Sequence, residues 1–595
     1  MTTNEKNELI SRLQSATGLS ADDKAALTRL LRTQQYGLVW EEKPEDVEEL
    51  LRTQMPVLTE VKEKAIISDD PQAPDHILIE GDNLEALNAL AYTHEGKIDV
   101  IYIDPPYNTG NKDFVYNDSF VDVEDGYRHS KWLSFMDKRL RLAKKLLSDK
   151  GVIFISIDDN EQANLKLLCD EVFGESNFVA NVIWKHTQQS KNDERHFSRQ
   201  YNHTFVVAKN KYELPDFQFK RTEEDNKNYK NPDNDPKGLW RSGDVRSPNF
   251  RKTLCFDIIA PDGKAIKAPA NGWRWSEESI KEKINSGEII FKNDNSGIIR
   301  KIYLCDQEGR IPENLWEGER FGSTRQAAAL IKDIFDGKQV FDTPKPLQLL
   351  QRIIELFPQR NCKVLDFFAG SGTTLHATMQ LNAEDGGHRQ CILVTNNENN
   401  ICEEVTYERN RRVIQGYTNA KGQQVEGLTN NNLRYYRVEH VARQNDNRTL
   451  RELMQRSTDL LCIKEGVYHE EREFAGLKFK PSVARYFHEG ERRMLVIYNE
   501  LAVAPIAAHV AECGATKEHP LKVYVFSNGR YAYEDELHAV ATLVEVCAMP
   551  EALLQSMQST LPPLHYGEED YTPDADAAAE ALADNYNYKE EGGEA

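Results

Sequence analysis

The chain of 595 residues is 39% hydrophobic and 29% charged, which is ordinary for a soluble globular protein and favours several domains over one. Its net charge of −22 excludes a protein whose whole surface binds nucleic acid, although a local basic cleft remains possible. The nine cysteines form no C-x-x-C pair, and neither a membrane span nor a secretory signal is visible, so we expect a cytoplasmic protein with reduced thiols and no metal site.

Residues 1–75 are predicted to form a helical N-terminal segment. Ser20 can cap one helix, and a second helix is bounded by Pro44 at its first turn and Pro56 at its end. Docking or dimerisation is the role that we expect for this segment.

The pattern changes at residue 76. Up to residue 210, short apolar runs such as the one before Asp104 alternate with stretches of helical periodicity. This alternation predicts an α/β domain built around a largely parallel sheet.

Between residues 211 and 334 the alternation stops. The stretch is rich in Asn, Asp, Pro and Gly, and residues 185–252 hold fifteen basic against ten acidic side chains. It is too long for a loop within a compact domain, so we predict an inserted domain. Three tryptophans are expected to form its core rather than to stack on bases: Trp240, Trp273 and Trp275.

The α/β pattern resumes over residues 335–441. A small C-terminal α/β domain, suited to contact a partner or a second copy, is predicted over residues 442–565. Residues 566–595 hold ten acids and one lysine, a composition typical of a disordered tail.

The stretch VLDFFAGSGTT carries a first motif. An apolar strand ends at Asp366, and Gly370 and Gly372 form a turn that opens a helix. Ligands of doubly wound sheets bind at such strand ends, where glycine lets the backbone approach them. The spacing is neither G-x-G-x-x-G nor a Walker loop, which disfavours a dinucleotide and a triphosphate. Alone, the motif is as typical of plain architecture as of a site.

A second motif, DPPY, follows another wholly apolar strand. Asp104 is an acceptor when ionised, the locked φ angles of Pro105 and Pro106 fix the direction of their carbonyls, and Tyr107 offers a flat face. These groups suit a planar heterocycle that carries an amino group. A lone D-P-P-Y is as often a structural turn.

Together the two motifs resemble those of the DNA amino-methyltransferases that use S-adenosylmethionine. DPPY precedes DFFAGSG by 262 residues, an order similar to the beta class, in which the recognition domain lies between the motifs. The runs NPDNDPKGLW, GWRWSEE and FDTPKPLQLL resemble modification subunits of type III restriction–modification systems. The resemblance covers about residues 75–441. It implies a circularly permuted, Rossmann-like, doubly wound methyltransferase sheet, with its catalytic half at 76–210, its cofactor half at 335–441 and a target-recognition domain at 211–334.

The resemblance also assigns roles to residues. The target adenine would be flipped out of the duplex, with Tyr107 stacking on it and with Asp104 and the Pro105 carbonyl accepting its amino hydrogens. The residues implied in cofactor binding are Asp82, Thr343, Lys345, Asp366, Phe368, Gly370, Gly372 and Glu398.

Some of these roles have plain alternatives. Asp82 could be only a helix N-cap, and Lys345 only a solvated lysine. The family places an acid for the cofactor ribose about 20 residues after the glycines, where this chain has Asn396, so Glu398 is the candidate for that role.

The inserted domain would read the DNA sequence. Its candidate DNA-binding residues, which could equally be a solvated charge run, are Lys220, Arg221, Lys227, Lys230, Arg241 and Arg251. The implied function is site-specific methylation of adenine N6 in double-stranded DNA by the modification and recognition subunit of a restriction–modification or phage-defence system. The partners that this implies are a second copy of the chain and a separate restriction subunit. Cytosine-N4 methylation, RNA or protein methylation, and a non-catalytic specificity subunit remain alternatives.

Overall fold

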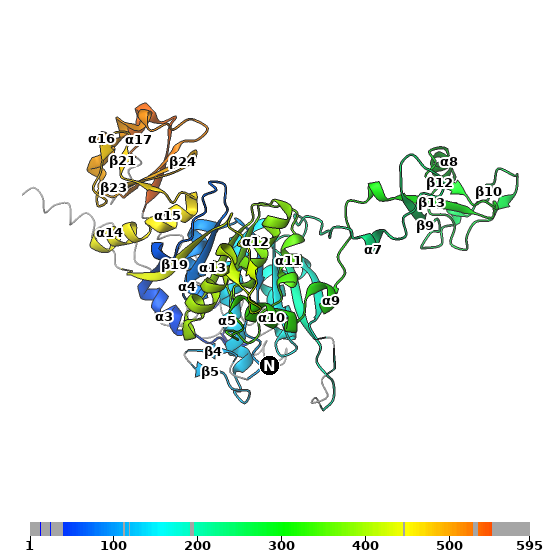
Figure 1. Cartoon of the computed structure of the whole chain (residues 1–595), viewed down its shortest axis with the longest axis horizontal. Coiled ribbons are helices and arrows are strands. Elements are labelled where there is room, and N and C mark those ends of the chain that lie inside the picture. The colour runs from blue at the N-terminus through cyan, green and yellow to red at the C-terminus, as the bar shows by residue number, and fades with distance from the viewer. Residues whose placement is uncertain are drawn as a thin grey trace, which may run out of the picture.

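The computed structural model describes residues 12–13, 24, 40–110, 113–117, 119–187, 189–190, 195–443, 447–526 and 533–549. Apart from Lys24, the predicted helix after Ser20 lies outside these residues, and so does the predicted acidic tail. Figure 1 shows a main body built on a large sheet, a lobe that extends from one side of it, and a further α/β unit on the other side.

A ten-stranded mixed sheet forms the main body. Its strands in spatial order are β1 (Gln54–Glu60), β19 (Asn432–Ala442), β2 (Asp75–Glu80), β16 (Gln390–Thr395), β15 (Lys363–Asp366), β3 (Ile98–Ile103), β6 (Leu147–Ile157), β8 (Tyr201–Ala208), β7 (Phe178–Lys185) and β14 (Leu315–Glu317). The central strands from β19 to β6 are parallel, whereas β1 and β8 run antiparallel to their neighbours. The middle residues of the strands β2, β16, β15, β3 and β6 are mostly apolar and buried, because both faces of the sheet are covered.

Helices cover both faces of this sheet. One layer, which shares a core with α3 (Asp46–Thr53), consists of α4 (Asn83–His94), α5 (Arg128–Leu146) and α6 (Gln162–Phe173). The other consists of α9 (Gly318–Phe321), α10 (Thr324–Ile334), α11 (Leu347–Glu355), α12 (Thr373–Asp385), a π-helical turn η6 (Ile401–Tyr407) and α13 (Glu408–Gln415). None of the helices within the described residues has the length and apolar content that crossing a bilayer requires.

The predicted end of the second N-terminal helix is wrong. The second predicted helix ends at Thr53, and residues 54–60, which include Pro56, form the edge strand β1. Leu58 pairs with Val438 in the antiparallel β1–β19 ladder, and the side chains of Val57 and Leu58 are fully buried. Burial and pairing with a distant strand therefore override the local helical pattern.

The predicted boundaries of the inserted domain are also wrong. The sequence assigns it residues 211–334, but β14 pairs in parallel with β7 and Trp316 lies in the core of the main body. The protruding lobe is shorter, because a backbone bridge between Phe219 and Arg310 closes its stem.

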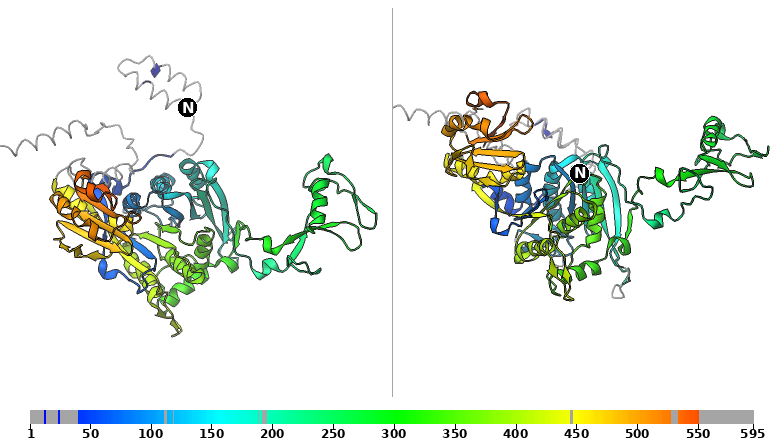
Figure 2. Two further views of the ribbon diagram at one scale, coloured as in Figure 1. Left: turned by 90° about the horizontal axis from the view of Figure 1, so that it is seen from above. Right: turned by 45° about the horizontal axis from the view of Figure 1, so that its top comes forward.

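The lobe has a small core of its own. Its elements are α7 (Glu223–Asn226), β9 (Trp240–Gly243), β10 (Ile258–Ile259), β11 (Ala265–Ile266), α8 (Glu277–Asn285), β12 (Ile289–Phe291) and β13 (Ile298–Tyr303). Trp240 and Trp273 are buried and Trp275 is half-buried, which confirms that these tryptophans pack inside the lobe. Figure 2 shows the lobe set apart from the main body in both views.

The C-terminal unit holds a five-stranded sheet in the order β20-β23-β24-β25-β26. Its elements are α14 (Asn447–Arg456), α15 (Thr458–Glu465), β20 (Glu470–Glu471), β21 (Glu473–Phe474), β22 (Leu477–Lys478), β23 (Ala484–Glu489), β24 (Arg492–Ile497), α16 (Val503–Ala507), β25 (Leu521–Phe526), α17 (Glu534–Leu537) and β26 (Val544–Met549). Asp459 on α15 accepts a hydrogen bond from the backbone N–H of Glu60 at 2.8 Å, which joins this unit to β1.

Candidate active site

Two strands that are far apart in the sequence place the two motifs side by side. In the parallel pair β3–β15, Val100 lies opposite Val364 and Ile101 opposite Leu365. Asp104 comes directly after β3, and Asp366 is the last residue of β15. Because parallel strands end at the same edge, both motifs lie at one edge of the sheet, as the sequence predicts.

The DPPY turn is held by hydrogen bonds. The hydroxyl of Tyr107 donates to Oδ1 of Asp104 at 2.8 Å, and the indole N–H of Trp132 donates to the carbonyl oxygen of Pro106 at 2.7 Å. Burial and then the Asp104 carboxylate raise the pKa of Tyr107 well above its ordinary value, so this hydroxyl stays protonated and donates. Pro106 therefore already serves as an acceptor for Trp132, and the carbonyl of Pro105 is the proline carbonyl left for a ligand.

Asn108 continues this turn in the left-handed conformation, with φ of 56°. Its side chain is fully buried and donates to Glu161, whose carboxylate is also fully buried and contacts His129 at 2.6 Å. Asparagine tolerates positive φ better than most residues. The buried Asn108–Glu161 contact therefore fixes the chain directly after Tyr107.

Lys345 lies at the same sheet edge, against the DPPY turn. Its ammonium forms an ion pair with Oδ2 of Asp104 and lies 5.3 Å from the centre of the Tyr107 ring. The side chains of Lys345 and Asp104 are 12% and 25% exposed, so the pair is partly screened from water. Both oxygens of Asp104 thus accept from the protein, and each keeps a lone pair for a further donor.

Asp366 is buried at the end of β15. It accepts hydrogen bonds from the hydroxyl of Thr374 and from the backbone N–H of Phe368, the latter at 3.0 Å. Burial raises the pKa of Asp366 to about 7, and the nearby Asp104 carboxylate adds to this rise. The carboxylate that anchors the glycine turn therefore changes charge near neutral pH.

The glycine turn depends on positive φ angles, 49° at Gly370 and 71° at Gly372. A Cβ on Gly372 would lie 2.5 Å from the side-chain nitrogen of Asn410. Three side chains that follow β16, which we name the turn clasp, hold this turn: Thr406, Arg409 and Asn410. Thr406 donates to the carbonyl oxygen of Gly370 at 2.6 Å, and Asn410 donates to that of Gly372 at 3.3 Å.

The turn clasp was not predicted from the sequence. Its residues lie on a π-helical turn and the start of α13, where polar side chains are usually interpreted as solvated. An available signal was the pair Asn399 and Asn400, whose adjacency favours left-handed backbone, and both adopt positive φ here. π-helical turns often mark functional sites.

The remaining predicted cofactor residues lie around the same edge. Asp82 caps α4, accepting from the backbone of Leu84 at 2.7 Å, so its helix-capping role is confirmed. Glu398 is exposed after β16, and Thr343 is exposed before α11. Phe368 lies 5.9 Å from Phe135, ring centre to ring centre.

This edge suits a cofactor that carries an adenosine and an amino acid. The strands β2, β16, β15 and β3 are consecutive in the sheet, and each is followed or ended by one of the predicted acids: Asp82, Glu398, Asp366 and Asp104. Between Phe368 and Thr373 the turn carries only the small side chains of Ala369 and Ser371, besides its two glycines. The residues present thus fit such a group.

A family model described as DNA methylase matches residues 98–406, more than half of the chain and both motifs. The chain belongs to this DNA methylase family. Its methyl donor is S-adenosylmethionine, as the resemblance implies.

Known relatives agree with this assignment. The chain is 39% identical over 348 residues to the type III restriction–modification enzyme StyLTI Mod subunit of Salmonella typhimurium, covering 54% of this chain and 52% of that protein. It is 34% identical over 365 residues to the type II methyltransferase M.KpnI of Klebsiella pneumoniae, covering 57% and 84% respectively. The chain thus spans about half of the length of the type III subunit. Against the solved structure of PvuII DNA methyltransferase, which is cytosine-N4-specific, identity is 14% and the TM-score is 0.30, with 60% of this chain and 97% of that chain covered.

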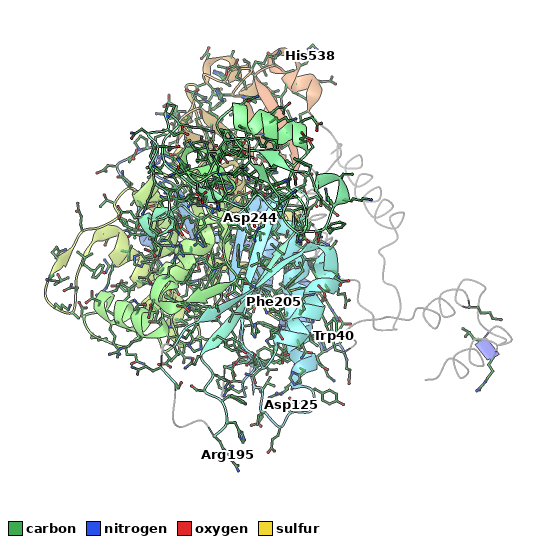
Figure 3. All side chains as sticks on the ribbon, turned by 90° about the vertical axis from the view of Figure 1, so that its right-hand side faces the viewer. Trp40, Asp125, Arg195, Phe205, Asp244 and His538 are labelled. Carbon is green, nitrogen blue, oxygen red and sulfur yellow. The ribbon has the colours of Figure 1, made fainter. Side chains whose placement is uncertain are left out.

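The methylase extends loops from the edge that carries Asp104. The loop after β3 bears the hairpin β4 (Val115–Tyr116) and β5 (Ser119–Phe120), and a second loop joins β7 to β8. Figure 3 shows Asp125 and Arg195, one from each loop, projecting beyond the end of the sheet that carries Phe205. In the second loop Phe197 is 87% exposed beside the exposed Arg195, a pair that the sequence analysis did not single out.

The predicted DNA-binding residues of the lobe fall into two groups. Arg221 donates to Asn226 and to the backbone of Asp225, and Lys227 pairs with Glu224, so both are engaged within the lobe. The others are exposed: Lys220, Lys230, Arg241 and Arg251. Of these, Arg241 also donates to the hydroxyl of Tyr229 at 3.1 Å.

A further loop of the lobe combines exposure with positive charge. Phe250 is 66% exposed and precedes Arg251 and Lys252. Within the described residues no carboxylate lies at ion-pairing distance from Arg251 or Lys252, in contrast to Lys267, which pairs with Asp257 at 2.7 Å. An uncompensated basic pair beside an exposed ring is the kind of surface that nucleic acid attracts.

Proposed function

We propose that this methylase transfers a methyl group to the N6 amine of adenine in double-stranded DNA, as the modification and recognition subunit of a type III restriction–modification system. The observation that carries the proposal is the adjacency of β3 and β15, which places the Asp104 carboxylate and the Gly370 turn at one sheet edge. The relatives support the assignment to type III systems, since several of them are Mod subunits.

Asp104 is the central catalytic residue of the proposal. Its carboxylate and the Pro105 carbonyl accept the two hydrogens of the amine, which turns the nitrogen lone pair out of conjugation with the ring. Tyr107 lies against the flipped base, replacing stacking worth about 1–3 kcal/mol. Lys345 fixes the direction of the Asp104 carboxylate, because it pairs with one of its oxygens and leaves a lone pair free.

The cofactor would lie along the carboxyl ends of β2, β16, β15 and β3. Asp366, Phe368, Gly370 and Gly372 would hold its amino-acid end, and Asp82 and Glu398 its adenosine. When bound, S-adenosylmethionine supplies the methyl group, its S–C bond breaking as the amine nitrogen forms the new N–C bond. The methylated nitrogen then carries one proton too many, and Asp104 can accept that proton.

The DNA would lie between the main body and the lobe. The flipped adenine enters at the edge where the loops with Asp125 and Arg195 project, and the lobe reads the flanking sequence through Lys220, Lys230, Arg241 and Arg251. Extruding a base costs a few kcal/mol, which phosphate contacts of such basic residues offset. We assign the lobe to residues 220–309, and the methyltransferase domain to the remainder of residues 54–442.

Partners are proposed on the same basis. A second copy of the chain and a separate restriction subunit would contact the C-terminal unit, which is predicted over residues 442–565, and the N-terminal segment. The relatives named as subunits of restriction–modification enzymes support a restriction partner.

The test is the identity of the methylated base. The chain is expressed alone in a host without DNA methylases, and the nucleosides of the host DNA are separated by mass spectrometry. N6-methyladenine should appear among the nucleosides, and sequencing of the modified bases in the same DNA should place it at one short sequence. N4-methylcytosine would overturn the adenine assignment, and the absence of any methylated base would overturn methylation by this chain alone.

A further inference from the structure

Arg409 differs from every other buried arginine of the described chain. Arg139, Arg389 and Arg434 are also buried, and each pairs with a carboxylate: Glu45 at 2.8 Å, Asp385 at 2.9 Å, and both Glu60 and Asp75 at 3.1 Å. Arg409 is 1% exposed, and within the described residues no carboxylate lies at ion-pairing distance from it. Its Nε–H also finds no hydrogen-bond acceptor among them.

The contacts of Arg409 all lie at the glycine turn. One terminal nitrogen donates to the carbonyl oxygen and the hydroxyl of Ser371, both at 3.2 Å, and to the hydroxyl of Thr373 at 2.6 Å. The other nitrogen lies 3.4 Å from Nδ1 of His376, one turn into α12. Burial lowers the pKa of Arg409 to about 9, which leaves the guanidinium charged at neutral pH.

A buried charge without a counter-ion is expensive, since removing a partner from a buried ion pair destabilises proteins strongly. Neutral hydroxyl and carbonyl acceptors satisfy hydrogen bonds but do not cancel the charge. An anion that binds close to the guanidinium offsets this free-energy cost. The ligand of this turn carries one anionic group, the carboxylate of its amino-acid end.

We propose that Arg409 is a positioning residue that fixes the cofactor turn and supplies, from beneath it, the positive charge that selects the carboxylate of the cofactor. The three residues of the turn clasp have different roles. Thr406 and Asn410 hold the carbonyls of Gly370 and Gly372 with neutral groups, and Arg409 adds the charge. The guanidinium acts through the turn, without touching the reacting atoms.

The proposal rests on the proposed position of the cofactor at the Gly370 turn, and the experiment separates the two. The full chain is titrated by calorimetry with S-adenosylhomocysteine and with S-adenosyl-3-thiopropylamine, which lacks only the carboxylate. If the unaltered chain binds neither ligand, the cofactor site itself is wrong. If it binds both, the ratio of their dissociation constants measures the preference for the carboxylate.

Arg409→Gln should weaken S-adenosylhomocysteine about tenfold and change the decarboxylated ligand less than about threefold, because only the first loses a charge interaction. Arg409→Lys should keep most of the preference, since it keeps the charge. Arg412→Gln is the matched control on the same helix, where Arg412 pairs with Glu408, and it should change neither ligand. Equal weakening of both ligands by Arg409→Gln, or no weakening, would overturn the proposal.

A second variant tests the role proposed for Arg409 if Arg409→Gln does not fold. His376→Glu places a carboxylate beside the guanidinium and gives it a counter-ion within the protein. It should raise the melting temperature and reduce the preference for S-adenosylhomocysteine about tenfold. An unchanged preference in this variant would contradict the proposal.

Discussion

Asp104 and Asp366 lie at the ends of adjacent strands but in different surroundings. Asp104 is partly exposed and paired with Lys345, whereas Asp366 is buried and bonded to Thr374 and a backbone N–H. Two carboxylates in unlike environments can hold unlike charges at neutral pH, as acid and base pairs in enzymes often do. Here the partly exposed Asp104 is suited to contact the base, and the buried Asp366 is suited to support the glycine turn.

Replacing Asp104 should separate catalysis from cofactor binding. Asp104→Ala is expected to lower kcat about 10²–10⁴-fold, because the variant no longer accepts the hydrogens of the amine, while the Kd for S-adenosylhomocysteine stays within about threefold. Tritium transfer to DNA and calorimetry measure the two quantities. The control is Asp125→Ala on the loop from the same edge, which contacts Lys131 and should retain activity. A fully active Asp104→Ala would contradict the mechanism.

Asp366 should make the free energy of unfolding depend on pH. Its pKa is raised to about 7 in the folded protein from an ordinary value of 3.8, so the folded state binds the proton more tightly. The stabilisation from this group is therefore fully present below about pH 4 and is lost as the pH rises through 7. Because one pKa unit corresponds to about 1.4 kcal/mol, the unaltered chain should lose at least that much stability relative to Asp366→Asn between pH 5 and 8. Denaturant unfolding at both pH values tests this, and parallel pH curves for the two proteins would refute it.

At the scale of elements, the site depends on how α12 begins. Gly372 is the N-cap of this helix and Gly386 is its C-cap, and both residues are left-handed, with φ of 71° and 68°. Only the first is crowded: its Cβ would meet Asn410 and Thr406, whereas nothing lies within 4 Å of a Cβ on Gly386. Comparing substitutions at these two glycines therefore distinguishes the effect of backbone strain from the effect of steric overlap with the turn clasp.

Alanine substitutions at these two glycines should differ. Gly386→Ala is expected to cost about 1 kcal/mol of stability and to leave cofactor binding intact, because it adds only the strain of a left-handed alanine. Gly372→Ala should cost more and should weaken S-adenosylhomocysteine at least about tenfold, since the turn must move away from Asn410. Thermal unfolding and calorimetry of both variants provide the comparison. Equal effects of the two substitutions would show that the clasp does not constrain the turn.

The sequence allowed the central strands and the meeting of the two motifs to be predicted, because apolar runs that end in Asp104 and Asp366 have a strong pattern. It did not predict β1, whose partner β19 follows hundreds of residues later. The Lys345–Asp104 pair and the contacts of Arg409 with the glycine turn also escaped prediction. A lysine in a loop and an arginine on a polar helix carry no local mark of what they contact after folding.

At the scale of the whole molecule, the lobe is joined to the body by a narrow stem. Phe219 and Arg310 exchange backbone hydrogen bonds of 2.9 and 3.0 Å, so the chain leaves and returns at neighbouring points. The lobe core contains none of the residues of the main cores. The lobe and the main body are thus units that can change separately.

Removing the lobe should therefore leave a folded body. We expect a chain in which residues 220–309 are replaced by a short Gly-Ser turn to melt within about 5 °C of the intact protein and to bind S-adenosylhomocysteine with similar affinity. It should no longer methylate DNA at a specific sequence. Differential scanning calorimetry and sequencing of methylated bases check the two halves of the prediction, and an unfolded product would show that the body needs the lobe.

The pairing of β1 with β19 also affects how the protein is made. Thr59 on β1 contacts Glu439 on β19 across 380 residues of sequence. At a translation rate of about 5–20 residues per second, the first strand leaves the ribosome roughly 20–80 seconds before its partner exists. During that time its apolar residues Met55, Val57 and Leu58 are unshielded, so a nascent chain of this length is a natural client for chaperones that hold exposed strands until synthesis is complete.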